Sequence, residues 1–362
     1  MYLRLDRRPR QSRAMMFLSP IMAIVLALVT FFIIFAIMGI DPVQALYLYF
    51  VDPLTAFWSF ENVIIKAAPI VLIAVGLSFC YQSNVWNIGA EGQYAVGAIF
   101  GSIIPIYLPD WGGVVPLTLM LLMGILGGMV YAAIPAWLKN RFNANETLTT
   151  LMLVYVANLL VDYLARTPWR DPAGHNFPNS HPFIDGQMLP VILGDSIRLN
   201  VVFVLIVVAA TWFLTERTLT GFKIRVLGQS PRAGEFGGFN RHRMVMLAML
   251  ISGGLAGLAG ICEVAGSIGQ FRTTISPGYG FTAIIVAFLG RLHPVGILLA
   301  GVLLALSYMG GEGAQIALGI SDQTTQVFQG MLLFYVLACD TLIFYRLRIV
   351  RAAPARAQTS AS

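Results

Sequence analysis

The densest group of polar side chains in this apolar sequence lies at residues 83–93, which read Ser-Asn-Val-Trp-Asn-Ile-Gly-Ala-Glu-Gly-Gln. Asn87, Glu91 and Gln93 could hydrogen-bond a polar solute, and the Trp86 ring could stack on a sugar or a base. No basic residue is present, although a turn at the cytoplasmic surface of a membrane protein usually carries some. Ionisable groups at membrane depth usually face a polar cavity, so we expect a broken helix that lines a transport pathway. The alternative is a short capped turn at the membrane interface, with Trp86 as an anchor.

A second interrupted segment covers residues 263–281. It contains Gln270 and Arg272 and then the sequence Ser-Pro-Gly-Tyr-Gly, before a short apolar half. Paired interruptions of this kind indicate a binding site near the membrane centre, between two internal repeats. We therefore expect Gln270 and Arg272 to belong to the pathway, and an inverted repeat to relate the two interrupted segments. In the alternative interpretation, Arg272 only neutralises Glu263.

The third unusual segment is a polar, basic stretch at residues 216–243. Within it, Ser230 can cap a helix whose first position is Pro231, and Gly237 or Gly238 can end that helix. The pattern predicts a short amphipathic helix that docks on a cytosolic partner. An ordinary basic loop that touches anionic lipid is the alternative.

The surrounding elements must lie in lipid, because hydrophobic residues make up 57% of the 362 residues and charged residues only 11%. A soluble protein carries roughly a quarter charged residues. Spanning a hydrocarbon layer of about 30 Å takes about 20 helical residues, and ten apolar segments approach that length. Lys66 lies close enough to one segment end to snorkel. The ten segments are residues 17–38, 63–82, 92–109, 114–138, 147–165, 199–215, 244–262, 273–290, 294–311 and 323–345.

These segments predict an all-α polytopic membrane protein of about ten transmembrane helices, with broken helices near the membrane centre. Most of the 23 Lys and Arg residues fall in alternate connections, which places both termini inside. The first apolar run is too long for a cleaved signal and is expected to be an anchor. A cysteine at Ser180 should then be labelled from outside, and one at Ser360 should not. The predicted domains are a cytoplasmic basic N-terminus (1–16), a single transmembrane domain (17–345) with an inner loop (216–243) and an outer loop (166–198), and a cytoplasmic tail (346–362).

Enzymatic chemistry has no support in the sequence. The nucleotide-binding pattern G-x-x-x-x-G-K-[ST] does not occur, and the three cysteines and four histidines show no metal-binding spacing, so we expect neither a cofactor nor a metal. The glycines at 253, 254, 257 and 260 have the spacing of close helix packing in membranes. Five prolines in the 166–198 loop favour an extended docking surface over a helix.

Four stretches together resemble one family. They are 87–93, the Asn-Glu-Thr-Leu-Thr-Thr-Leu-Met-Leu sequence at 145–153, the Pro-x-Ala-Gly-x-x-x-Gly pattern at 231–238, and 278–294 with its Gly-Tyr-Gly-Phe start. This combination resembles the permease subunits of bacterial ABC importers of the ribose and branched-chain amino acid type, and most closely the nucleoside and simple-sugar branch. The resemblance covers about residues 60–345.

The resemblance implies a permease in the inner membrane that translocates a nucleoside or a simple sugar by alternating access. Its implied partners are cytoplasmic ABC ATPase subunits that hydrolyse the ATP, a periplasmic or lipid-anchored substrate-binding protein, a second permease copy or paralogue, and membrane lipid, with no nucleic acid. It assigns ATPase coupling to Pro231, Arg232, Ala233, Gly234 and Gly238, although the family usually has alanine where Gly234 stands. It assigns the substrate pathway to the 87–93 segment with Asn87, Glu91 and Gln93, and we expect Trp86 to lie beside that pathway.

Two other functions remain open. An ion-coupled secondary transporter would use Glu91 or Glu263 as the ion carrier and would need no ATPase. A structural membrane scaffold would leave the polar cluster at 83–93 unexplained.

Overall fold

The computed structural model describes residues 2–7, 13–174, 176–194 and 196–350. Most of the predicted cytoplasmic tail, Ser360 included, lies outside these residues. The chain forms two compact units, one made of residues 1–42 with 326–362 and the other of residues 43–325.

The first unit joins the two ends of the sequence. Helix α1 (Arg13–Ile37) packs with α13 (Asp322–Phe344), and β1 (Tyr2–Arg7) pairs antiparallel with β4 (Tyr345–Val350). The Phe31 ring lies 4.9 Å from that of Phe328. Polar pairs between the helices join Ser19 to Asp340 at 2.5 Å and Thr30 to Tyr335 at 2.7 Å. The terminal strands are a feature that hydropathy did not predict.

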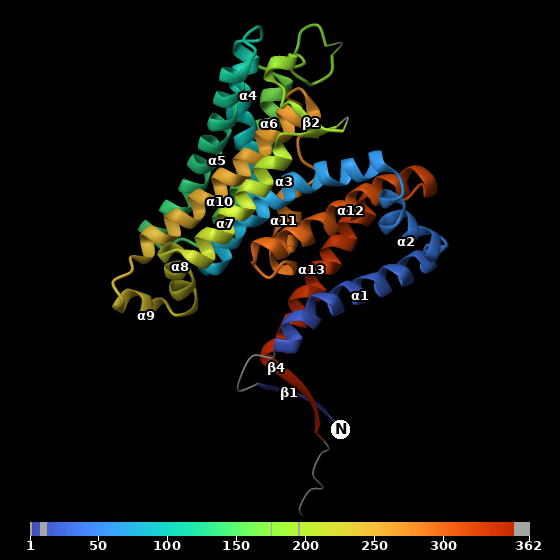
Figure 1. Ribbon diagram of the computed structural model, residues 1–362, viewed down its shortest axis with the longest axis vertical. Coiled ribbons are helices and arrows are strands. Elements are labelled where there is room, and N and C mark those ends of the chain that lie inside the picture. Colours follow the sequence, from blue (N-terminus) through green and yellow to red (C-terminus); the bar gives the residue numbers. More distant parts are fainter. Residues whose placement is uncertain (1, 8–12, 175, 195, 351–362) are drawn as a thin grey trace, which may run out of the picture. The chain divides into compact units, whose positions relative to one another are not determined.

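The second unit contains the remaining helices (Figure 1). They are α2 (Pro42–Phe50), α3 (Phe57–Gln82), α4 (Ala90–Tyr107), α5 (Val114–Phe142), α6 (Glu146–Arg166), α7 (Asn200–Arg217), α8 (Leu219–Gln229), α9 (Pro231–Phe236), α10 (Arg241–Glu263), α11 (Tyr279–Leu289) and α12 (Pro294–Leu318). A short hairpin, β2 (Val191–Leu193) with β3 (Ile197–Arg198), lies in the loop before α7.

Helices α4, α5 and α10 lie side by side and approach through glycines (Figure 1). A Cβ atom added to Gly97 would lie 2.2 Å from the Cα of Gly257, and one on Gly128 would lie 2.0 Å from the Gly253 carbonyl. No larger residue fits these contacts, which lets the helix backbones touch as small residues do in membranes. The structure confirms the predicted packing role of the glycines in α10.

The all-α membrane architecture is confirmed. Eight helices of the described chain are long and apolar enough to cross a membrane: α1, α3, α5, α6, α7, the α10 helix with its extension, α12 and α13. The other two predicted spans form α4, with 18 residues, and α11, with 11 residues. The count of ten spans and the orientation of the termini stay predictions.

Two interruptions of the helices are present where the sequence predicts them. Residues 83–89 separate α3 from α4, and Asn84 there has a positive φ of 55°. A π-helical turn (Val264–Ile268) extends α10, and residues 269–278 then run without helix to α11. Gly269 and Gly278 have φ of 74° and 102°, a region that glycine adopts readily. The position of these breaks at the membrane centre, and the inverted repeat, stay predictions.

Candidate solute-binding site

Glu91 lies where the two interrupted segments meet. Its side chain is buried in the first turn of α4, and its Oε2 accepts a hydrogen bond from the backbone N–H of Gly280 in α11 at 2.6 Å. A Cβ on Gly280 would lie 2.4 Å from the Glu91 nitrogen, so this approach requires glycine. Glu91 therefore faces the N-terminal turns of two helices, whose dipoles both favour a negative charge.

A polar cavity of about 220 Å³ adjoins this carboxylate. Its wall comes from α4, from α6 and from the extended stretch before α11. The lining residues are Glu91, Tyr94, Ala95, Asn158, Val161, Thr273, Thr274, Ile275 and Ser276. The cavity is smaller than the 300–1,000 Å³ of most ligand pockets.

Tyr94 of the cavity lining begins a row of three tyrosine rings. The rings of Tyr94 and Tyr279 are 6.4 Å apart, and those of Tyr279 and Tyr308 are 5.5 Å apart. The Tyr308 hydroxyl lies 2.8 Å from that of Thr282. Sequence analysis missed these residues, because three different helices contribute the rings and only the fold brings them together.

Charged groups lie in the same unit. Lys66 forms an ion pair with Glu312 of α12, with 2.6 Å between Nζ and Oε1. Helix α3 begins at Phe57, before the expected residue 63, so Lys66 lies further inside the helix than expected. Its snorkelling stays a prediction. Glu263 is buried and experiences the positive charges of Lys66 and Arg272. In the described part of the chain Glu263 and Arg272 make no ion pair within 4 Å, and the Arg272 Nε donates instead to the Thr274 carbonyl at 2.9 Å.

Asn87 and Gln93 lie behind the cavity rather than on its lining. Asn87 is fully buried, and its Nδ2 donates to the Gln93 Oε1 at 3.0 Å and to the Ser252 Oγ at 3.1 Å. Its Oδ1 accepts from the Gly89 N–H and from the Gln93 Nε2. The pair therefore holds the 83–89 turn closed against α10.

The other predicted pathway residues also lie away from the cavity lining. Trp86 is 45% exposed and packs against Tyr81 and Phe288, with ring centres 5.6 and 5.9 Å away. Gln270 and Arg272 belong to the stretch after α10, one half-buried and the other exposed.

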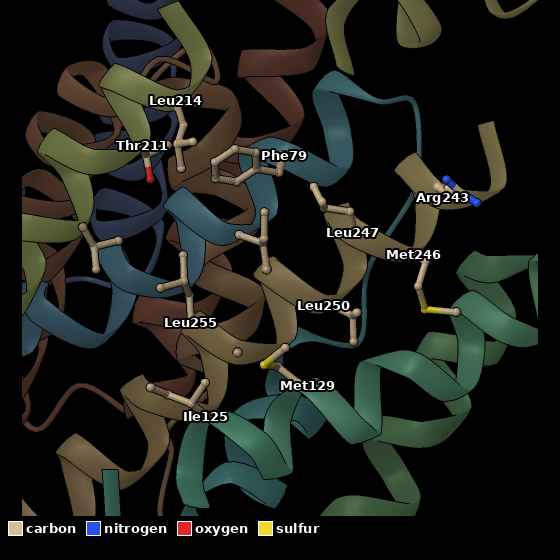
Figure 2. Close-up of a pocket in the computed structure, with 13 residues that line it drawn as sticks. Phe79, Ile125, Met129, Thr211, Leu214, Arg243, Met246, Leu247, Leu250 and Leu255 are labelled. Atoms are coloured by element: carbon tan, nitrogen blue, oxygen red, sulfur yellow. The ribbon is translucent and has the colours of Figure 1, made fainter. Parts of the chain in front are cut away.

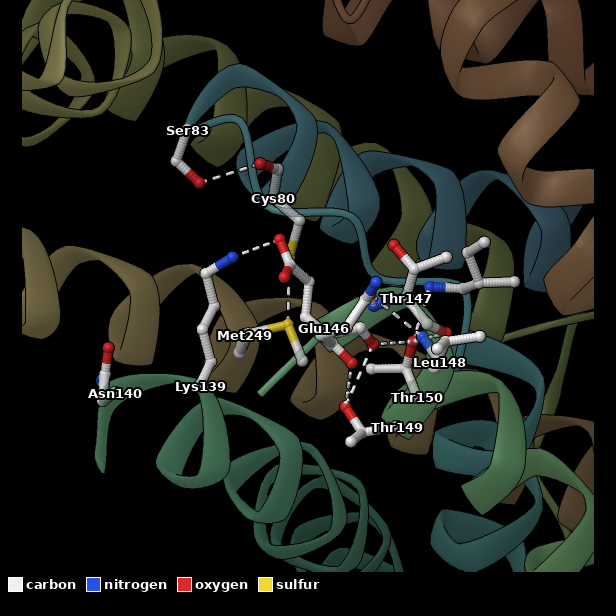
Figure 3. A network of polar contacts seen from close by, with 12 residues as sticks. Cys80, Ser83, Lys139, Asn140, Glu146, Thr147, Leu148, Thr149, Thr150 and Met249 are labelled. Carbon is white, nitrogen blue, oxygen red and sulfur yellow. Dashed lines mark hydrogen bonds and ion pairs between the residues drawn. The ribbon is translucent and has the colours of Figure 1, made fainter. Parts of the chain in front are cut away.

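The Asn-Glu-Thr motif of 145–153 connects the 83–89 turn to α6 (Figure 3). The Asn145 Oδ1 accepts from the backbone N–H groups of the first turn of α6. Glu146 forms an ion pair with Lys139 at the end of α5, and the Thr150 Oγ1 accepts from the Ile88 N–H at 3.2 Å. The motif thus fixes one end of the helix that carries Asn158 into the cavity.

The 166–198 loop is bonded to the other side of the cavity wall. Three backbone N–H groups of the loop donate to carbonyls after α10: Ser180 to Phe271, Phe183 to Gly269 and Leu189 to Ala265, each at 2.8 Å. Ser180 is only 2% exposed, and its Oγ accepts from the Phe271 N–H. It is therefore a poor labelling site, contrary to expectation. His175 and Asp195 of this loop lie outside the described residues.

A short helix, α9, is present where the sequence predicts one, with Pro231 at its first position, and its coupling role stays a prediction. Ser230 precedes it without a side-chain capping bond, and Gly238 follows it with φ of 80°. Gly234 faces inward, since a Cβ there would lie 2.5 Å from the Leu227 Cδ2 of α8.

The sequence pattern of α9 points to its small residues and not to its phenylalanine. Phe236 is 94% exposed, beside exposed Arg232, Ala233 and Glu235. Helix α8, which supports α9, was also not predicted.

Comparison with known proteins identifies the family of this chain. Residues 59–337 match the family model described as branched-chain amino acid transport system / permease component. The chain belongs to this permease family. It is therefore a multi-pass permease subunit of an ABC transporter in the inner membrane, as the motifs indicate.

Several curated relatives resemble the chain over most of its length. It is 32% identical to a glucose ABC transporter permease of Haloferax volcanii, over 96% of this chain and 94% of that protein. It is 25% identical to a guanosine ABC transporter permease of Bacillus subtilis, over 90% and 94%. It is 24% identical to a nucleoside ABC transporter permease of Lactococcus lactis, over 88% and 90%.

Proposed function

We propose that this permease moves a simple sugar or a nucleoside into the cell through the cavity beside Glu91. The supporting observation is a carboxylate held at two helix N-termini on the wall of a polar cavity. The relatives named for glucose, guanosine and nucleosides support this substrate class. Their substrates all carry hydroxyl groups on a ring, which a carboxylate and an amide can bind.

Each cavity group has a role in this proposal. Glu91 accepts hydrogen bonds from ring hydroxyls, while Asn158 both donates and accepts. Charge-assisted hydrogen bonds are the stronger ones, so Glu91 is the main recognition group. Tyr94 supplies an aromatic face for a sugar or a base. Asn87 and Gln93 position this site from behind, and Gln270 and Arg272 belong to the outer approach.

The partners follow from the two ends of the second unit. An ATPase pair, which hydrolyses the ATP, binds at α8 and α9, and a substrate-binding protein docks on the 166–198 loop. A second permease completes the translocation unit. Two guanosine permease proteins of Bacillus subtilis and two nucleoside permease proteins of Lactococcus lactis match this chain, which favours a paralogue as the second permease.

The test is uptake of radiolabelled glucose and guanosine by cells that carry the complete transporter. We expect one of the two to accumulate, and Glu91→Gln to lower its uptake about 10- to 100-fold, because a lost hydrogen bond to a charged group costs about 1.5–3 kcal/mol. The matched control is Asp162→Asn, which removes a carboxylate of α6 that pairs with Arg166 on the surface. The control should transport normally, and both variants should retain the ATPase.

The same assay separates the two transport mechanisms. Uptake that needs ATP and survives an uncoupler supports the proposal. Uptake that an uncoupler abolishes, and that proceeds without the ATPase, would favour an ion-coupled transporter with Glu91 as the carrier.

A further inference from the structure

A second, larger cavity of about 660 Å³ lies along one face of α10, between α5 and α7 (Figure 2). Its α10 side consists of Met246, Leu247, Leu250, Ile251, Gly254 and Leu255, with Arg243 at one end. These positions recur every three or four residues and so form a single helix face. The groove has no carboxylate on its lining and is separate from the Glu91 cavity.

The size of the groove fits one hydrocarbon chain. From Arg243 to Leu255 the helix rises about 18 Å, at 1.5 Å per residue. One leaflet of a bilayer has a hydrocarbon depth of about 15 Å, half of the full core. The groove thus runs about the depth of one leaflet from its charged end, which is the length that an acyl chain needs.

The charged end of the groove has a cation available for a ligand. The Arg243 side chain is exposed, and within the described ranges its guanidinium has no hydrogen bond or ion pair to the protein. In Figure 2 it lies beyond Met246 and Leu247, at the end opposite Ile125. The helices of the two neighbouring walls carry further basic residues in their last turns, Arg217 in α7 and Arg141 in α5.

We propose that this groove binds one anionic phospholipid, with its phosphate on Arg243 and one acyl chain along α10. Arginine is the residue best suited to a phosphate because its fork of N–H groups binds two oxygens at once. The apolar walls bind the acyl chain. The basic loops of membrane proteins face the cytoplasm, where anionic lipids are abundant, so the site belongs to the inner leaflet.

The experiment is native mass spectrometry of the full-length permease in detergent. The probes are phosphatidylglycerol and phosphatidylethanolamine with identical acyl chains, added separately at equal concentration. We expect the wild-type protein to retain phosphatidylglycerol at least fivefold better. Arg243→Gln should remove that preference, and Leu250→Trp, which fills the groove, should reduce retention of both lipids. Arg241→Gln removes a nearby exposed charge outside the groove and should behave as wild type.

Three outcomes would overturn the proposal. The first is equal retention of the two lipids by the wild-type protein. The second is an Arg243→Gln protein that still prefers phosphatidylglycerol. The third is that the wild-type protein retains neither lipid and that the Leu250→Trp substitution dissociates its oligomer. The groove would then be an interface with another protein chain. A thermal unfolding measurement on each variant shows whether it is folded. If Leu250→Trp does not fold, the comparison of Arg243→Gln with the wild-type protein decides the proposal.

Discussion

Two asparagines of the second unit have opposite surroundings, and we expect one to contribute to stability and the other to transport. Asn87 is buried and bonded to Gln93, Ser252 and the Gly89 N–H. Asn158 is exposed and lines the cavity. A role in stability is therefore expected for Asn87 and a role in transport for Asn158.

We predict that Asn87→Leu lowers the thermal unfolding temperature of the purified permease by several degrees. The substitution leaves the Gly89 N–H and the Gln93 and Ser252 side chains without this partner, and each unsatisfied buried group costs about 1–3 kcal/mol. Asn158→Leu, the matched control, should unfold like wild type and lose uptake. An Asn87→Leu protein with normal unfolding would contradict the structural role.

The sequence predicts which segment forms the cavity better than it predicts which individual side chains line that cavity. Polar density singles out residues 83–93, and Glu91 does lie on a cavity. The inward direction of Asn87 depends on Ser252 of α10, far away in the chain. The sequence also gives no signal for Tyr279, because only the fold brings its ring beside that of Tyr94.

Among the elements, α9 carries one exposed aromatic side chain, Phe236, which we expect to contact a partner. An almost fully exposed phenylalanine is typical of an interface, since aromatic residues are enriched in binding hot spots. Gly234 packs on Leu227 instead, so Gly234→Glu would disturb the support from α8 as well as the docking surface.

We predict that Phe236→Ala weakens retention of the ATPase about tenfold or more, because a hot-spot side chain contributes about 2 kcal/mol or more. The measurement is pulldown of the ATPase with the tagged permease. Phe177→Ala is the matched control, since Phe177 is also exposed but belongs to the 166–198 loop. If both variants hold the ATPase like wild type, α9 is not the main contact.

Sequence patterns predict the existence of these elements and miss their ends. Pro231 and the glycines after α9 mark the helix because their backbone preferences are local. The predicted start of this span at residue 63 is wrong, because Glu61, which interrupts the apolar run, is buried within α3, and that helix begins at Phe57.

At the scale of the whole molecule, α10 is long enough to span the distance between the two surfaces of a membrane. Its 23 residues rise about 35 Å, more than the roughly 30 Å hydrocarbon core of a membrane. Helix α9 precedes one end, and the 166–198 loop is bonded to the stretch after the other end (Figure 1). We therefore expect the two features to face opposite compartments.

We predict that an impermeant thiol reagent labels Ala173→Cys in intact cells, and labels Glu235→Cys only after the membrane is opened. Both positions are exposed, on the loop and on α9, and the native cysteines at 80, 262 and 339 are buried and give little background. The reverse pattern would invert the orientation inferred from the basic residues.

The bonds between the 166–198 loop and the cavity wall join backbone to backbone at three points. Almost any side chain can occupy such positions, because the bonding atoms are common to every residue except proline as a donor. The exposed face of this loop can therefore change during evolution to suit a new binding protein while its attachment to the wall persists. Natural variation in this family would then accumulate on the loop surface, and the exchange of one loop for another between relatives becomes a practical route to transporters with altered partners.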